Sequence, residues 1–145
     1  MPFKIHGIPA FQDNYIWLFH SEETGLTFIV DPGESKPVFD FLNKLQLSLD
    51  GILVTHHHPD HIGGIDKLLE RFSIPVFGTA RIKQATKVIA DKEIISLSGH
   101  TFEVMSIPGH TYDHVAYYSA EESILFCGDT LFSSGCGRLF EGTPQ

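Results

Sequence analysis

The stretch Thr55–His61 reads THHHPDH and directly follows the apolar run GILV at 51–54. Neutral imidazole and carboxylate groups are ligands for first-row divalent metals. In an extended segment His56 and His58 project to the same side, so this pair can bind one ion. Pro59 bends the chain away from strand geometry, so Asp60 and His61 can reach a second ion nearby. The spacing therefore predicts a metal site that begins where a buried strand ends.

Two other segments have the same arrangement, in which ligand-type residues follow an apolar strand. The run 104–107 leads into Pro108-Gly109-His110, and the run 124–127 leads into Gly128-Asp129. Active sites of α/β sheets lie off the carboxyl ends of strands. We therefore expect three strand ends, with their histidines and carboxylates, to converge at one edge.

The other histidines have simpler interpretations. His57 lies between two ligand candidates and should point to the opposite face, as a packing residue. For His114, at the start of a strand, we expect a structural hydrogen bond. His6, His20 and His100 are isolated and are interpreted as ordinary surface or core residues.

Periodicity predicts many short strands with a few helices between them, which is typical of a layered α/β sandwich. Ser35 is the expected N-cap of a helix over which Val38, Phe41, Leu42 and Leu45 form one apolar face. The same spacing predicts a second helix over 65–72, and a weaker pattern predicts a third over 81–88. Strands are expected at 14–19, 26–31, 51–55, 75–78, 93–97, 102–107, 114–119 and 124–127.

Composition narrows the class of protein. The chain has 145 residues, 42% hydrophobic and 19% charged, which suits one globular domain. A net charge of −8 disfavours nucleic-acid binding. No apolar run approaches the roughly 20 residues of a membrane span, and the start lacks a signal-peptide pattern, so we expect a cytoplasmic protein. Cys127 and Cys136 are too few for a disulfide framework, and no G-x-S-x-G or P-loop motif occurs.

Taken together, the segments THHHPDHIGG, PGHT and CGDTLF resemble the metallo-β-lactamase superfamily. Within it, FQDNYIWLF and SSGCGRLFEGT resemble the glyoxalase II family, the bacterial hydroxyacylglutathione hydrolases. The resemblance runs from about Ile8 to Thr143. It implies an αββα sandwich with a two-metal site at one edge.

The resemblance also implies a ligand set for two divalent ions, zinc most often and iron or manganese in some members. His56, His58 and His110 would bind the first ion, and Asp60 and His61 the second. Asp129 would bridge both ions.

The implied reaction is hydrolysis of a glutathione thioester. A metal-bound hydroxide, held between the ions by ligands such as Asp60 and Asp129, would attack the thioester carbonyl. The substrate would be S-D-lactoylglutathione and the products D-lactate and glutathione. Arg138, Leu139 and Phe140 would bind the substrate, with Arg138 meeting a glutathione carboxylate.

The sequence departs from the family at its C-terminus. A further histidine on the second metal and a helical substrate domain are absent, and Gly142-Thr143-Pro144 is typical of a helix start just before the chain stops. We therefore interpret residues 1–145 as a partial catalytic domain, with possible self-association through the truncated sheet edge. The alternatives are a metal-binding fragment of little activity, or another superfamily enzyme such as a persulfide dioxygenase or a lactamase.

Overall fold

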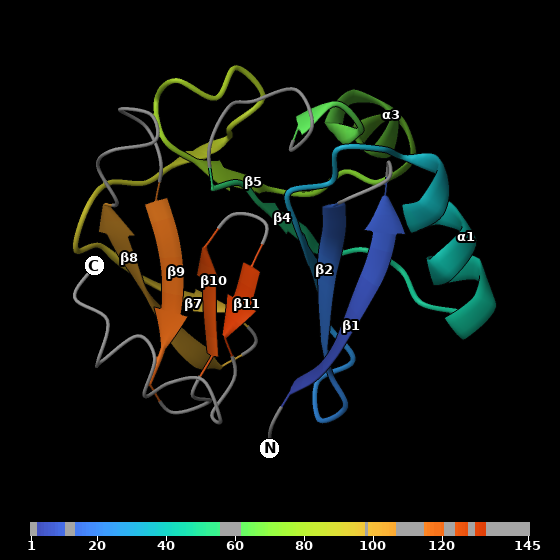
Figure 1. Cartoon of the computed structure of the whole chain (residues 1–145), viewed down its shortest axis with the longest axis horizontal. Helices are drawn as coiled ribbons and strands as arrows, with labels where there is room; N and C mark the ends of the chain where they lie inside the picture. The colour runs from blue at the N-terminus through green and yellow to red at the C-terminus, as the bar shows by residue number, and fades with distance from the viewer. Residues whose placement is uncertain are drawn as a thin grey trace.

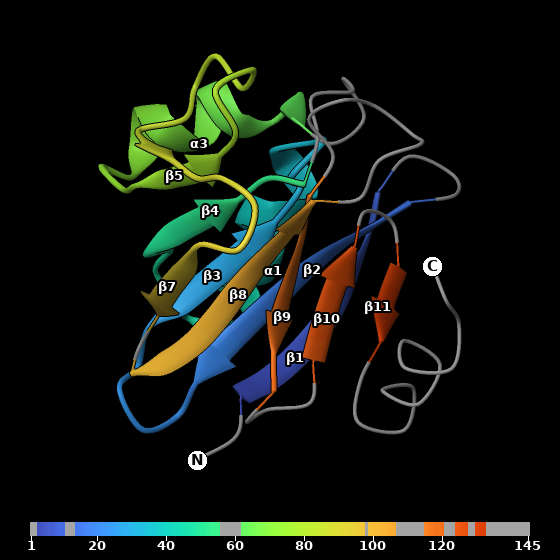
Figure 2. The ribbon, with the colours of Figure 1, turned by 90° about the vertical axis from the view of Figure 1, so that its left-hand side faces the viewer.

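A computed structural model of the chain describes residues 3–10, 14–55, 62–97, 99–106, 115–120, 124–127 and 130–132. These residues form two β-sheets packed face to face, and helices α1 and α3 cover the outer face of one of them (Figures 1 and 2). The described layers are therefore helices, sheet and sheet, which agrees with the expected αββα sandwich in an incomplete form.

The first sheet has the strand order β1-β2-β3-β4-β5-β6. Its first three strands are antiparallel neighbours, whereas β3, β4, β5 and β6 run parallel. The carboxyl ends of the parallel strands consequently lie at one edge of the sheet. The strands are β1 (Phe3–Ala10), β2 (Asn14–Ser21), β3 (Thr27–Val30), β4 (Gly51–Leu53), β5 (Val76–Gly78) and β6 (Lys87–Val88).

The second sheet is antiparallel throughout, in the order β11-β10-β9-β8-β7. Because neighbours alternate in direction, β8 and β10 end at the edge where β9 and β11 begin, the upper edge in Figure 1. The strands are β7 (Ile94–Leu97), β8 (His100–Ser106), β9 (Val115–Ser119), β10 (Ile124–Cys127) and β11 (Thr130–Phe132).

The helices α1 (Lys36–Leu45) and α3 (Ile65–Arg71) form where the apolar spacing predicts them. Each buries one apolar stripe against the outer face of the first sheet. Ser35 is the N-cap of α1, but its backbone is already helical and its hydroxyl makes no capping hydrogen bond. The buried residues of this outer cluster are Ile8, Ile16, Leu18, Ile29, Val38, Leu42, Leu49, Ile52, Val54, Ile65, Leu68, Val76 and Ile82.

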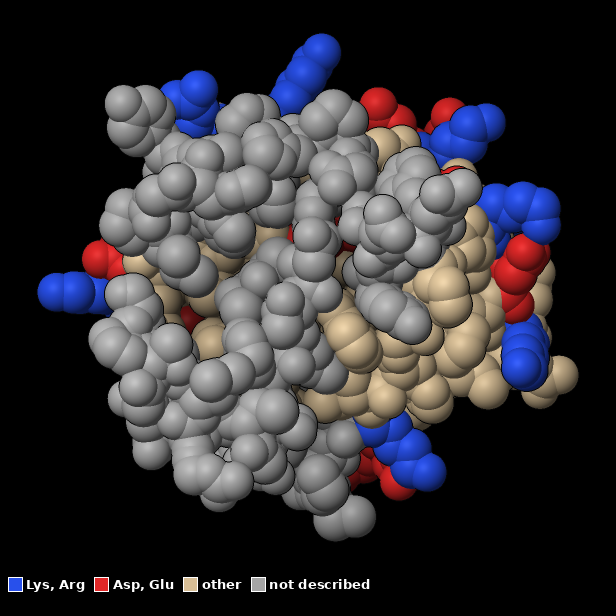
Figure 3. Space-filling model, in the orientation of Figure 1, with Lys and Arg blue, Asp and Glu red and all other residues tan. Residues whose placement is uncertain are grey.

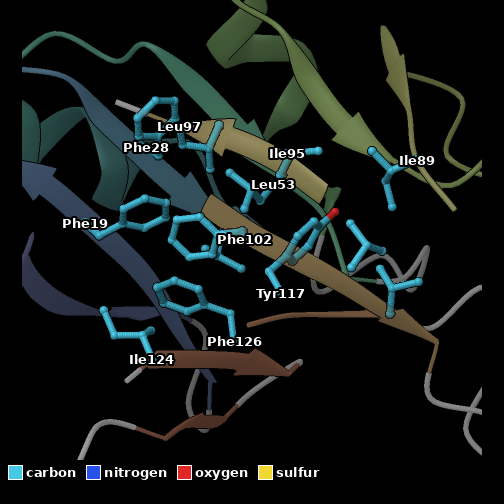
Figure 4. Packing of buried hydrophobic residues seen from close by; sticks show 13 residues of the cluster. Phe19, Phe28, Leu53, Ile89, Ile95, Leu97, Phe102, Tyr117, Ile124 and Phe126 are labelled. Carbon is cyan, nitrogen blue, oxygen red and sulfur yellow. The ribbon is translucent and has the colours of Figure 1, made fainter. Parts of the chain in front are cut away.

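The inner cluster fills the space between the two sheets (Figure 4). Phe19 lies at its centre, with ring centroids 5.3, 5.6 and 5.1 Å from those of Phe28, Phe102 and Phe126. Such offset aromatic pairs join the sheets by more than area burial alone. The buried members are Phe19, Phe28, Val30, Leu53, Ile89, Ile95, Leu97, Phe102, Val104, Val115, Tyr117, Ile124 and Phe126.

The helix predicted over 81–88 is wrong. Residues 79–86 form turns instead, and Lys87–Val88 add the short strand β6 to β5. Thr86 begins this pairing, because its Oγ1 accepts a hydrogen bond from Val76 N at 2.9 Å and its own N–H donates to Val76 O. Strand pairing to a preformed sheet thus outweighs a weak helical pattern. Strands β1 and β11 were not expected from the sequence either.

Candidate metal centre

The strand ends that precede the predicted ligand segments meet at one edge of the sandwich. Val115 N donates a hydrogen bond to Thr55 O at 2.8 Å, so the start of β9 touches the segment that follows β4. Ser106, at the end of β8, pairs with Val115, and Phe126 of β10 pairs with Tyr117. The convergence expected of the three strand ends is therefore present up to the last described residue of each (Figure 1).

The predicted site residues themselves lie outside the described residues, and their roles stay predictions. Among the described residues, no group of three or more His, Cys, Asp or Glu side chains could hold a metal ion. The predicted ligands and substrate contacts outside the description are His56, His58, Asp60, His61, His110, Asp129, Arg138, Leu139 and Phe140. His57, His114 and Cys136 also lie outside it.

Asp31 is a site-forming residue that sequence reasoning missed. Its carboxylate is buried and accepts hydrogen bonds from Thr55 N at 2.7 Å and Thr55 Oγ1 at 2.5 Å. Its backbone has φ +54°, in the left-handed region that aspartate tolerates better than most residues. The carboxylate thus holds the residue directly before His56. The available signal was an acidic side chain at the end of an apolar strand, in Asp31-Pro32-Gly33.

Gly64 brings the start of α3 against the loop that follows β3. Gly64 N donates to Pro32 O at 2.8 Å. A Cβ at this position would lie 2.6 Å from the backbone atoms Glu34 C and Ser35 N, closer than real contacts allow. At Gly64 only glycine fits without a shift of the backbone. Thr55, which precedes residues 56–61, and Gly64, which follows them, therefore contact the same loop, through Asp31 and Pro32 respectively.

Tyr117 connects the two sheets beside this edge. Its hydroxyl donates to Val54 O at 2.7 Å and lies 3.2 Å from Phe77 O, so β9 contacts β5 and the residue that follows β4. Burial raises the pKa of the Tyr117 hydroxyl well above its usual value, and the negative charge of Asp31 raises it further. The hydroxyl therefore stays protonated and remains a hydrogen-bond donor.

The end of β8 has its own support. Ser106 N donates to Asp91 Oδ1 at 2.7 Å. Asp91 lies in the turn before β7, where Lys92 adopts φ +71° and donates its N–H to Val104 O. The turn thus binds the backbone of Val104 and Ser106, two residues near the end of β8. This places a second carboxylate at a strand end that leads into a predicted ligand segment.

The isolated histidines behave as ordinary residues, as expected. His20 Nδ1 lies 3.0 Å from Thr27 Oγ1, and the His6 ring lies 5.2 Å from that of Phe41. Burial lowers the pKa of His6, and the positive charges of His20 and Lys4 lower it further. His100 is buried in β8.

The described surface is mixed in charge. On the face shown in Figure 3, acidic and basic side chains are scattered around the periphery, with no broad basic field among the residues drawn in colour. The exposed ion pairs Lys36–Asp40 (2.7 Å) and Lys4–Glu22 (3.4 Å) contribute little to stability. An anionic ligand would therefore have to be recognised by local contacts. No helix in the described part of the chain is long and apolar enough to cross a membrane.

Comparison with curated proteins identifies close relatives. The chain is 52% identical over 141 residues to a hydroxyacylglutathione hydrolase of Chromohalobacter salexigens and 53% identical over 141 residues to one of Klebsiella pneumoniae. Each match covers 95% of this chain and 55% of the relative. The chain thus spans about half the length of the curated relatives it matches.

Solved structures share the fold. A B3 metallo-β-lactamase, BLEG-1, superimposes with a TM-score of 0.75 at 26% identity, covering 84% of this chain and 70% of that one. TTHA1623 in a di-iron-bound form gives 0.71 at 25% identity, covering 88% and 73%. ETHE1 from Myxococcus xanthus gives 0.71 at 25% identity, covering 92% and 56%. The family model of the metallo-β-lactamase superfamily matches residues 10–87 and 83–144, and the chain belongs to this superfamily.

Proposed function

We propose that the chain carries the metal centre of a thioester hydrolase that cleaves S-(2-hydroxyacyl)glutathione, with S-D-lactoylglutathione as substrate. The observation that carries this proposal is the identity of about one half to proteins named hydroxyacylglutathione hydrolase, over a match that covers 95% of this chain. The motif SSGCGRLFEGT near the end of the chain supports the same subgroup.

Residues 1–145 are proposed to form part of the metallo-β-lactamase-like catalytic domain. The cytoplasmic location expected from the sequence is part of this proposal. In this scheme the described sheets supply a rigid frame, and the catalytic groups lie in the segments that join the strands. Sites supported in this way by regular elements hold their geometry better than sites on unsupported loops.

The chemistry of the donor set suits a pair of divalent ions. Imidazole accommodates zinc and iron, and carboxylates also accommodate manganese. Under the proposal His56, His58 and His110 bind one ion, Asp60 and His61 the other, and Asp129 both. Ions bound in this way supply a water molecule of lowered pKa and an electrophile for the thioester carbonyl.

The remaining residues orient this centre and its substrate. Asp31 and Thr55 hold the chain where it enters the ligand segment, and Asp91 holds the end of β8. Arg138 is proposed to form a bidentate contact with a glutathione carboxylate, and Leu139 and Phe140 to line the substrate. A thiolate is a good leaving group, so the scheme requires no protein nucleophile and little acid catalysis.

The variant Asp129→Ala tests this assignment. We expect it to lose zinc binding and S-D-lactoylglutathione hydrolysis together, because one carboxylate serves both ions. Asp40→Ala is the matched control, since Asp40 is exposed on α1 and pairs with Lys36 at the surface. Turnover retained in Asp129→Ala would reject the bridged centre. A strict requirement for iron and molecular oxygen would instead indicate a persulfide dioxygenase.

A further inference from the structure

The peptide unit between Val54 and Thr55 is held from both sides. Its carbonyl oxygen accepts a hydrogen bond from the Tyr117 hydroxyl at 2.7 Å, and its N–H donates to Asp31 Oδ1 at 2.7 Å. The two residues of this peptide and both of its partners are buried, so all four are shielded from water. Donor, peptide and carboxylate thus form one chain of hydrogen bonds, in which each bond polarises the next.

The following peptide unit is held as well, by the same strand that carries Tyr117. Thr55 O accepts from Val115 N at 2.8 Å, and Val115 lies two residues before Tyr117 on β9. Residues two apart on a strand face the same side, and both belong to the inner cluster. The second sheet therefore reaches across the sandwich to fix two consecutive peptide units of the first.

Packing alone does not require the Tyr117 hydroxyl. Of the buried residues that form the described inner cluster, Tyr117 is the one with a polar side chain. Phe126 on β10 and Phe102 on β8, the two strands that flank β9, lie on the same side of the sheet as Tyr117 (Figure 4). A phenylalanine would fill the same volume without the cost of burying a hydroxyl. The hydroxyl lies where its proton reaches the carbonyl oxygen of Val54, two residues before His56.

We propose that Tyr117 is a positioning residue for the metal centre, and that its hydroxyl, opposite Asp31, fixes the direction in which the chain leaves β4. The inference rests on the proposed function, because the segment it orients is the proposed ligand segment that begins at His56. Because the peptide plane at residues 54–55 is already fixed, His56 loses less conformational freedom when it binds an ion. Loss of the hydroxyl should therefore weaken metal binding more than it weakens the fold.

The test compares zinc affinity, measured by competition with a chromophoric chelator, in the 145-residue chain and in Tyr117→Phe. We expect the variant to bind zinc about tenfold more weakly, the lower end of the effect of removing a residue that orients metal ligands. Amide hydrogen exchange at Thr55 should be faster in the same variant. Tyr118→Phe, on the next residue of the strand and half-buried, should change neither quantity.

A second control separates positioning from stability. Phe102→Leu removes packing from the same inner cluster, where Phe102 lies against Phe19. It should unfold at lower urea concentration and still bind zinc with the affinity of the unsubstituted chain. If Tyr117→Phe does not fold, Asp31→Asn replaces it with the same expected loss, because an uncharged side chain weakens the hydrogen bond to Thr55 N–H without abolishing it.

The outcomes are distinct. Equal zinc affinity in the unsubstituted chain and Tyr117→Phe would overturn the positioning role and leave the proposed function standing. Equal losses of affinity in Tyr117→Phe and Phe102→Leu would also overturn it, because stability would then explain the effect. Failure of the unsubstituted chain to bind zinc would refute the proposed function and the positioning role together.

Discussion

Replacing Asp31 by alanine should destabilise the fold strongly. The change leaves Thr55 N and Thr55 Oγ1, both buried, without the carboxylate that accepts from them. Each hydrogen bond to a charged group contributes about 1.5–3 kcal/mol. Alanine at φ +54° adds about 1 kcal/mol of backbone strain. Relief of the buried charge offsets several kcal/mol of this sum.

We therefore expect Asp31→Ala to lower the free energy of unfolding by about 3 kcal/mol, out of a total of roughly 5–15 kcal/mol for a domain. Equilibrium urea unfolding measures the change, with an unaltered slope as evidence that the unfolded state is the same. Asp50→Ala is the matched control. Asp50 accepts one hydrogen bond, from Thr27 N at 2.9 Å, so its loss should cost about 1 kcal/mol.

Asp31→Asn refines the comparison. Asparagine tolerates the left-handed backbone and keeps one oxygen for Thr55 N, so we expect a loss of about 1 kcal/mol. The order of stability should be the unsubstituted chain, then Asp31→Asn, then Asp31→Ala. An Asp31→Ala variant as stable as Asp50→Ala would refute the idea that this carboxylate holds the end of β4.

Three other predictions can be tested, two drawn from the described contacts and one from the sequence. Gly64→Ala should lower the free energy of unfolding by about 2 kcal/mol, because its Cβ would meet backbone atoms of the loop that follows β3. Gly99 has open space around it, so Gly99→Ala should cost only the strain of its positive φ. Thermal unfolding of the two variants measures the difference. The pKa of His6, measured by NMR, should lie below 6.5, and a pKa at or above 6.5 would be contrary. The contribution of His6 to the free energy of unfolding should therefore fall as pH drops through 6.5. His20→Asn should raise the pKa of His6. The chain should self-associate through a sheet edge, which light scattering can detect. A monodisperse monomer over a range of concentrations would count against this.

Local patterns were sufficient for much of the fold. The spacing of Val38 and Leu42 predicted α1, and the apolar runs at 51–54 and 75–78 predicted the buried parallel strands β4 and β5. Helix α1 buries one apolar stripe and β4 is buried on both faces, so a helical period predicts the first and a continuous apolar run the second. The helix prediction for 81–88 was wrong because Lys87–Val88 pair with β5, and the local sequence pattern does not contain that neighbouring strand.

The supporting residues of the site were beyond local reasoning for the same cause. Asp31 precedes Thr55 by 24 positions, and Tyr117 follows Val54 by 63. Neither residue belongs to a motif of metal ligands, and each acquires its role only when the sheets are in register. The predicted ligand residues differ from these supporting residues, because their types and spacing indicate metal binding from the sequence alone. Their placement in space remains a prediction.

The most direct test of the proposed function is hydrolysis of S-D-lactoylglutathione by the purified 145-residue chain. Thioester cleavage would be followed with zinc added and, in parallel, after removal of divalent ions by a chelator. We predict turnover that the chelator abolishes and that added zinc restores. A folded, zinc-loaded chain without turnover, or turnover that is indifferent to the chelator, would contradict the proposal.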